Sequence, residues 1–95
     1  MVTLLTRLDA TDEAAATPLA AVLSELSGTG PSEPGSLAYE AFGTEENLTT
    51  FYVKESWSSR EDADRHARRV ETDGYVERPV DLLATPFATV TLLEI

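Results

Sequence analysis

The chain has 95 residues with 42% hydrophobic content, enough for one hydrophobic core and not for two, so we expect a single domain over residues 1–95. Its 17 acidic and 7 basic residues give a formal net charge of -10, which argues against binding to nucleic acid or to an anionic membrane surface. The absence of cysteine excludes disulfides and zinc–thiolate sites, and no apolar run is long enough to cross a bilayer, so we expect a cytoplasmic protein.

The first third of the chain predicts a strand followed by a helix. Residues 2–8 carry apolar or β-branched side chains on both faces, which is typical of a strand that is covered on both sides. Apolar residues then recur at helical spacing, which predicts a helix over residues 18–27. Pro18 suits a first helical turn, and Thr11 or Asp12 could cap one or two further turns before it.

The centre of the chain predicts a β-hairpin followed by a second helix. A connection rich in glycine and proline precedes a second strand over residues 37–42. A loop of hairpin length leads to a third strand over residues 51–57, which should pair with the second in antiparallel orientation. Ser58 and Glu61 have the spacing of a capping box, so we expect a helix that begins there and continues to Val70.

The end of the chain predicts a fourth strand, because residues 87–95 alternate again. The order strand, helix, strand, strand, helix, strand predicts an α+β protein with a ferredoxin-like βαββαβ fold, in which two helices cover one face of a four-stranded antiparallel sheet. The strands carry apolar residues on both faces, so the second face should be covered by another copy of the chain. We therefore expect a homodimer through the sheet.

Two ring-bearing residues are candidates for chemistry. His66, the only histidine, falls on the apolar stripe of the second helix, where a neutral imidazole is suited to accept a proton from a substrate. The alternative is a histidine that donates to a carbonyl and fills space. Trp57 ends the third strand, where it could stack on an aromatic ligand or anchor the core or the dimer interface.

Glu55 is a carboxylate in the apolar row that Phe51 and Trp57 also occupy. Such a group must find a partner or raise its pKa. A salt bridge to an arginine and a role in a binding site are both open to it. The candidate arginines are Arg7, Arg68 and Arg69.

The tyrosines of the strands could bind a ligand oxygen. Tyr39 and Tyr52 can each hydrogen-bond a quinone or phenol, although tyrosines in strands also serve packing. With one histidine and no cysteine, no spaced set of metal ligands is visible in the sequence.

The run from Phe51 to His66, Phe-Tyr-Val-Lys-Glu-Ser-Trp-Ser-Ser-Arg-Glu-Asp-Ala-Asp-Arg-His, resembles the signature of the antibiotic biosynthesis monooxygenase family. That signature is an aromatic strand with Glu and Trp, then a capped helix that ends in His. Glu33-Pro34-Gly35, followed by Tyr39, is similar to the start of the family's second strand. The resemblance implies a dimeric α+β barrel and oxygenation by O2 without flavin, haem or metal, with the substrate anion supplying the electron.

The resemblance also implies roles for individual residues. His66 would line a pocket between helices and sheet and remove a proton, and Trp57 would hold the ring system of the substrate. The substrate-binding candidates are Tyr39, Tyr52, Glu55 and Phe51. The expected function is therefore a cofactor-independent monooxygenase acting on a phenolic or polycyclic aromatic substrate; the alternative is a dimer of the same fold that binds a small ligand without turnover or acts as an isomerase or cyclase.

One departure from the family narrows this expectation. The haem-degrading branch of the family carries asparagine on its first strand, whereas the inward positions here are Thr6 and Leu8. Haem turnover is therefore not expected.

Overall fold

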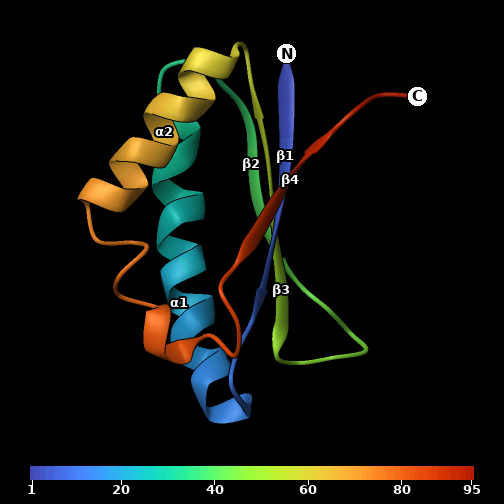
Figure 1. The fold of residues 1–95 in the computed structure, drawn as a ribbon, viewed down its shortest axis with the longest axis vertical. Coiled ribbons are helices and arrows are strands. Elements are labelled where there is room, and N and C mark those ends of the chain that lie inside the picture. The colour runs from blue at the N-terminus through green and yellow to red at the C-terminus, as the bar shows by residue number, and fades with distance from the viewer.

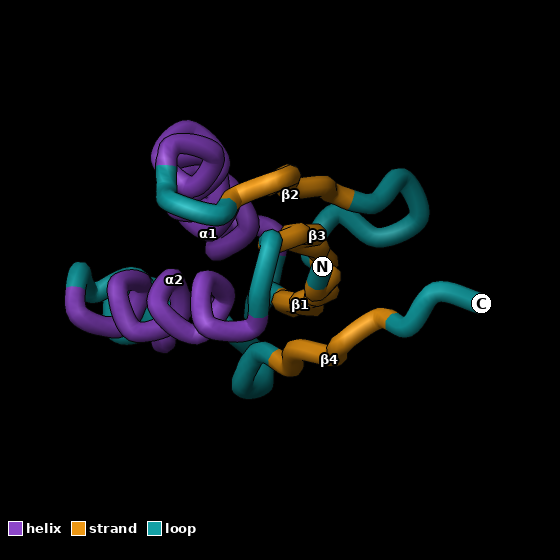
Figure 2. Tube along the Cα trace, turned by 90° about the horizontal axis from the view of Figure 1, so that it is seen from above, coloured by secondary structure: helices purple, strands orange, loops and turns teal.

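A computed structural model describes residues 1–95. The elements in chain order are β1 (Val2–Asp9), α1 (Glu13–Thr29), β2 (Ser36–Gly43), β3 (Thr50–Trp57), α2 (Arg60–Thr72) and β4 (Ala88–Leu92), with short 3-10 turns at Gly30–Ser32 and Val80–Leu82. The strands form one antiparallel sheet in the order β2-β3-β1-β4, and both helices lie on the same face of it (Figures 1 and 2). The predicted ferredoxin-like α+β fold is confirmed. Neither helix has the combination of length and apolar character that would let it cross a membrane.

Helix α1 includes the further turns before Pro18 that the sequence left open, with Asp12 as their cap, and it ends at Thr29 instead of Ser27. It begins at Glu13 because Asp12 Oδ1 accepts a hydrogen bond from the backbone N–H of Ala15 at 2.8 Å, which satisfies a donor of the first turn. Pro18 lies inside the helix, where it removes one backbone donor without ending the helix. The additional turns bury Ala15 and Ala16 against the core.

The cap of helix α2 lies one residue later than predicted. Ser59, not Ser58, is the N-cap: its Oγ accepts from the backbone N–H of Asp62 at 3.2 Å. The hydroxyls of Ser58 and Ser59 both donate to Asp62 Oδ2, at 2.7 and 2.9 Å. The carboxylate that completes the cap is therefore Asp62, and the prediction for Glu61 was wrong.

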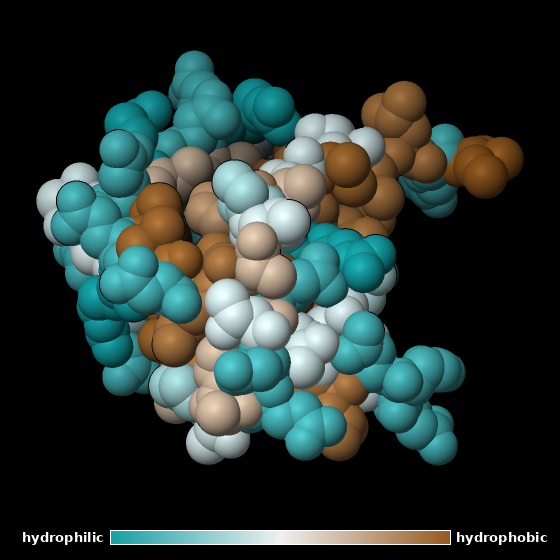
Figure 3. Space-filling view, turned by 60° about the horizontal axis from the view of Figure 1, so that its bottom comes forward, coloured by the Kyte–Doolittle hydropathy of each residue, from teal (hydrophilic) through white to brown (hydrophobic).

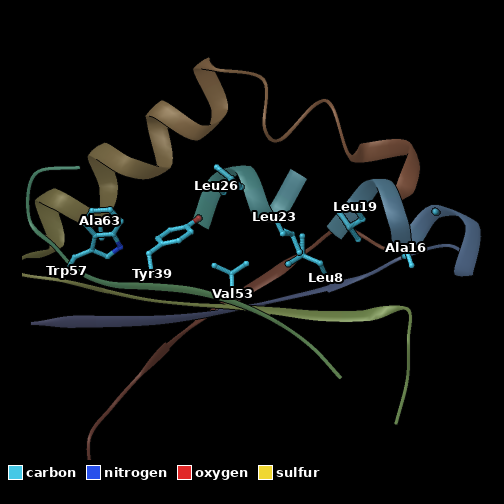
Figure 4. Packing of buried hydrophobic residues seen from close by; sticks show 11 residues of the cluster. Leu8, Ala16, Leu19, Leu23, Leu26, Tyr39, Val53, Trp57 and Ala63 are labelled. Atoms are coloured by element: carbon cyan, nitrogen blue, oxygen red, sulfur yellow. The ribbon is translucent and has the colours of Figure 1, made fainter. Parts of the chain in front are cut away.

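The core lies between the sheet and the two helices. Figure 4 shows buried side chains of β1, β2 and β3 standing in a row beneath residues of α1 and α2. Trp57 and Leu19 are completely buried. The other face of the sheet has no helix over it, and the exposed Phe42, Val90 and Leu92 are among its residues.

Strand β4 is shorter than predicted. Leu92 pairs with Thr3 of β1, so almost no chain remains on β1 for the residues after Leu92 to pair with. The last residues leave the sheet as an extended arm, which carries the exposed Leu93 and Ile95 and projects from the body of the molecule (Figure 1).

Candidate active site

A cavity of about 180 Å³ lies between the helices and the helix-facing side of the sheet. Of its 18 lining residues 13 are hydrophobic, so a ligand inside it would contact mostly apolar side chains. Side chains of both helices, of all four strands and of the segment 75–87 form the walls. Thr6 and Leu8, the predicted inward residues of β1, both line it.

Three ionisable side chains line one part of this cavity. Glu55 of β3 and Tyr39 of β2 are direct neighbours across the sheet, and His66 reaches the same place from α2. The ring of His66 meets the Tyr39 ring edge-on, with 5.2 Å between centroids and 71° between planes. The fold therefore brings together three of the predicted site residues.

His66 is held by a residue that the sequence analysis did not single out. Glu33 Oε2 lies 2.6 Å from His66 Nδ1, and the two side chains are only 9% and 5% exposed. In the tautomer with the proton on Nδ1, the imidazole donates this bond to the carboxylate. His66 Nε2 has no hydrogen-bond partner in the protein. Every fully enclosed side-chain nitrogen or oxygen has such a partner. Nε2 is therefore not fully enclosed and remains accessible.

Glu33 entered the sequence analysis only as part of the resemblance. It lies in the turn-rich connection before β2, 33 residues from His66, and no periodic pattern links the two positions. The available signal was its place close to the start of the strand that carries Tyr39. Only the packing of α2 over that connection brings the carboxylate and the imidazole together.

Trp57 lies behind His66 and does not line the cavity. The two rings are 4.8 Å apart between centroids and 30° between planes. The indole Nε1 donates to Glu55 Oε1 at 3.1 Å. Figure 4 shows Trp57 beneath Ala63 of α2, with Tyr39 beside it. Trp57 thus contacts two residues of the cavity, whereas a ligand inside the cavity would meet His66 before the indole.

Glu55 forms none of the salt bridges considered for it. Arg7 pairs with Asp9, and Arg69 lies near Glu33 and Asp73. Burial raises the pKa of Glu55, an effect that the indole hydrogen bond and the neighbouring His66 only partly offset.

Tyr39 is kept as a neutral phenol. Burial, together with the nearby negative charges of Glu55 and Glu33, raises the pKa of its hydroxyl. The hydroxyl has no hydrogen-bond partner in the protein and is not fully enclosed, so it can donate to a ligand oxygen.

The remaining two predicted site residues lie outside the cavity. Tyr52 pairs with Arg7 and Phe42 across the sheet. Successive side chains of a strand point to opposite faces, and the next residue, Val53, lines the cavity. Tyr52 therefore points away from the helices. Phe51 faces the helices but packs against the core beyond the cavity wall. No group of three or more His, Asp or Glu side chains is arranged to hold a metal ion.

These features define a class: a ferredoxin-like α+β protein whose two helices and sheet enclose an apolar cavity with a histidine, a carboxyl group and a phenol in its wall. The model of the family described as antibiotic biosynthesis monooxygenase matches residues 1–78. The chain therefore belongs to the antibiotic biosynthesis monooxygenase family, and the resemblance seen in the sequence is confirmed.

Solved structures show the same fold at low sequence identity. A candidate antibiotic biosynthesis monooxygenase from Nitrosomonas europaea is 16% identical, with a TM-score of 0.90 over 100% of this chain and 99% of that one. PA3566 of Pseudomonas aeruginosa has 21% identity and a TM-score of 0.88 over 99% and 93%. Rv0793 of Mycobacterium tuberculosis has 21% identity and a TM-score of 0.87 over 99% and 94%. No curated protein matches the chain.

Proposed function

We propose that this protein is a cofactor-independent monooxygenase that oxidises a phenolic aromatic substrate with molecular oxygen. Membership of the monooxygenase family supports the general role. The observation that carries the proposal is an imidazole held at Nδ1 by Glu33, with its Nε2 free, in the wall of a mostly apolar cavity. An oriented base beside a dry binding space is what the formation of a reactive substrate anion requires.

The size of the cavity limits the substrate. A dry cavity of about 150 Å³ holds one benzene molecule, and the cavity here measures about 180 Å³. This favours a substrate with one ring or two small rings over a larger polycyclic one. A larger ring system would require movement of the segment that carries Tyr75 and Pro79, which forms part of the wall.

The chemistry assigns one task to each residue of the site. His66 Nε2 takes a proton from the substrate, and Tyr39 donates a hydrogen bond to a substrate oxygen. The substrate anion then reduces O2, a carbon–oxygen bond forms, and loss of water leaves a quinone. One oxygen atom enters the product, the other leaves in water with the two hydrogens lost by the substrate, and the substrate itself is the reductant.

The test is oxygen consumption by the purified, metal-free protein with a panel of hydroquinones and anthrones. We expect His66→Gln to lower turnover by about 100-fold or more, since this is the typical contribution of a positioned base. Arg68→Gln is the control, because Arg68 lies on the same helix and has no hydrogen bond or salt bridge. Circular dichroism shows whether both variants are folded. An unchanged rate in His66→Gln would remove the histidine from the mechanism.

A proton-transfer isomerase is the second candidate. Glu55, whose pKa is raised by burial so that it retains its proton more readily, lines the same cavity as His66, and such a pair can move a proton between two atoms of a substrate. An isomerase works in the absence of oxygen and consumes none. Anaerobic conversion of the substrate to an isomer would favour this candidate over the monooxygenase.

The proposal includes a homodimer through the open face of the sheet. Phe42, Val90 and Leu92 are 46%, 54% and 39% exposed, and every residue of β4 is exposed. Figure 3 shows apolar atoms, in brown, on a projection at the upper right of the molecule, with a hollow below it. Apolar surface of this kind supports burial against a second copy of the chain.

A further inference from the structure

A row of charged side chains leads from the cavity to the surface. His66 Nδ1 lies 2.6 Å from Glu33 Oε2, Glu33 Oε1 lies 3.7 Å from a guanidinium nitrogen of Arg69, and Arg69 Nε lies 3.5 Å from Asp73 Oδ2. Exposure rises along the row: the side chains of His66 and Glu33 are 5% and 9% exposed, and those of Arg69 and Asp73 are 56% and 48% exposed. The row thus joins a buried base to solvent.

A second, smaller pocket of about 60 Å³ lies beside this row. Glu33, Arg69 and Asp73 line it, and none of them lines the main cavity. His66 lines both spaces, so the imidazole separates an apolar chamber from a polar pocket at the surface. The smaller pocket has room for a few water molecules, and its polar groups can bind them.

We infer that Glu33 is the positioning residue of His66 and the outlet for the proton that His66 takes from the substrate. The inference rests on the proposed role of His66 as a base. Its Nε2 receives the proton from the substrate while Nδ1–H passes its own to Glu33, so the ring remains neutral. Glu33 then releases the proton to water in the smaller pocket and returns to its ionised form. When the oxygen–oxygen bond breaks, Nε2–H gives its proton to the oxygen that leaves as water, and Nδ1 takes a proton back from solvent through Glu33. Both hydrogens lost by the substrate are thereby accounted for, and His66 again has a bare Nε2.

The groups around the imidazole are consistent with this direction of transfer. Glu55 and Tyr39 face His66 from the sheet, Glu33 faces it from the connection before β2, and Arg69 lies on its own helix. Glu55 already accepts a hydrogen bond from Trp57 and lies on the cavity side. Glu33 is the only carboxylate that both contacts the imidazole directly and lines the smaller pocket.

The Glu33 side chain makes few contacts besides the one with His66. Apart from its contacts with His66 and Arg69, the Glu33 side chain has no hydrogen bond or salt bridge. Of its two contacts the one with the imidazole is much the shorter, at 2.6 Å against 3.7 Å for Arg69. The arrangement therefore assigns the carboxylate to the imidazole.

The first test compares the kinetics of Glu33→Gln with those of Glu61→Gln. Both changes remove one negative charge, but Glu61 is exposed at the start of α2 and has no side-chain partner. We expect kcat of Glu33→Gln to fall at least about 10-fold, because the amide cannot take up the proton. KM should change less than about twofold, because Glu33 does not line the main cavity. Equal kcat values for Glu33→Gln and the control would overturn the inference.

Chemical rescue separates proton relay from structural support. Glu33→Ala leaves a space beside the smaller pocket, where added formate can act as the missing carboxylate. We expect formate to raise the rate of Glu33→Ala several-fold and to leave the wild-type rate unchanged. If formate has no effect although the variant is folded and binds substrate, the relay is wrong.

Nitrogen-15 NMR tests the hold on His66 without any substrate. Because His66 is the only histidine, its ring signals need no assignment. In the neutral ring of the wild type we expect protonated Nδ1 and bare Nε2, and in Glu33→Ala a shift of the proton toward Nε2. An unchanged spectrum would overturn the positioning role. If the wild type turns over no substrate of the panel, the monooxygenase proposal fails, and the NMR result still decides whether Glu33 holds the imidazole.

Discussion

Burial of Glu55 in the site lowers the stability of the folded protein at neutral pH. Its pKa is raised above the ordinary value of 4.5 by burial, so the unfolded chain loses the proton at lower pH than the folded protein does. Between the pKa of Glu55 in the unfolded chain and its raised pKa in the folded protein, the native state retains more protons than the unfolded state. The free energy of unfolding therefore falls as pH rises through this range. Below pH 4.5 both states are protonated and the effect disappears.

We predict that Glu55→Gln raises the free energy of unfolding at pH 7, because it removes a buried carboxyl group whose pKa is raised by burial. The gain should vanish toward pH 4, and the amide oxygen can still accept the hydrogen bond from Trp57. Urea denaturation of both proteins at several pH values measures it. Glu61→Gln, an exposed change of the same kind, should give no comparable gain. A gain of equal size at low and neutral pH would show that packing, and not ionisation, is responsible.

The residues of the site were predictable where a local pattern determines them. The helical stripe placed His66 inward, and strand alternation placed Glu55 on the same side of the sheet. Contacts between distant segments were not predictable in this way. No spacing rule connects Glu33 with His66, and the partner of Glu55 proved to be the indole two residues away rather than an arginine.

The turn after helix α1 shows how an element fixes a wall of the cavity. Gly30 is buried with φ of -53°, so alanine would meet no backbone strain there. A Cβ at this position would nevertheless lie 2.8 Å from the ring of Tyr39, a distance that forces the ring to move. The close approach of this turn therefore sets the position of the Tyr39 hydroxyl.

We predict that Gly30→Ala lowers the free energy of unfolding by about 1–3 kcal/mol, the usual effect of overpacking. Turnover should fall as well, because Tyr39 shifts in the cavity wall. Gly28→Ala is the matched control, since a Cβ there meets nothing within 4 Å and alanine favours the helix by about 0.5–1 kcal/mol. Thermal denaturation and activity assays on both variants measure the effects. Equal stability of the two variants would contradict the steric explanation.

The type and order of the helices and strands were more predictable from the sequence than the residues at which they begin and end. The periodicity gave the strands and helices in the correct order, and the sequence offered Asp12 as a possible cap of turns before Pro18, but it did not show that Asp62 completes the cap of α2. The end of β4 depends on a different kind of information. The alternation of residues 87–95 continues to the last residue, whereas pairing ends where β1 has almost no residues left to offer.

In the whole molecule, one face of the sheet has no helix over it, so a single copy of the chain exposes apolar side chains there. Leu5 and Val90 are neighbours across β1 and β4 on this face, and Tyr52 and Phe42 are neighbours across β3 and β2. Apolar side chains thus occur on all four strands of this face, with the charged Arg7, Glu40 and Lys54 between them. In a dimer with twofold symmetry, the same side chains would be buried in both copies of the chain.

We predict that Val90→Asp converts the protein from dimer to monomer at micromolar concentration, because the substitution places two desolvated charges in a twofold interface. Val80→Asp is a closely matched control: Val80 is 58% exposed and Val90 54%, but Val80 lies in the 3-10 turn before β4 and away from the sheet. Size-exclusion chromatography with light scattering measures the mass. A monomeric wild type, or dissociation of both variants alike, would contradict a dimer through this face.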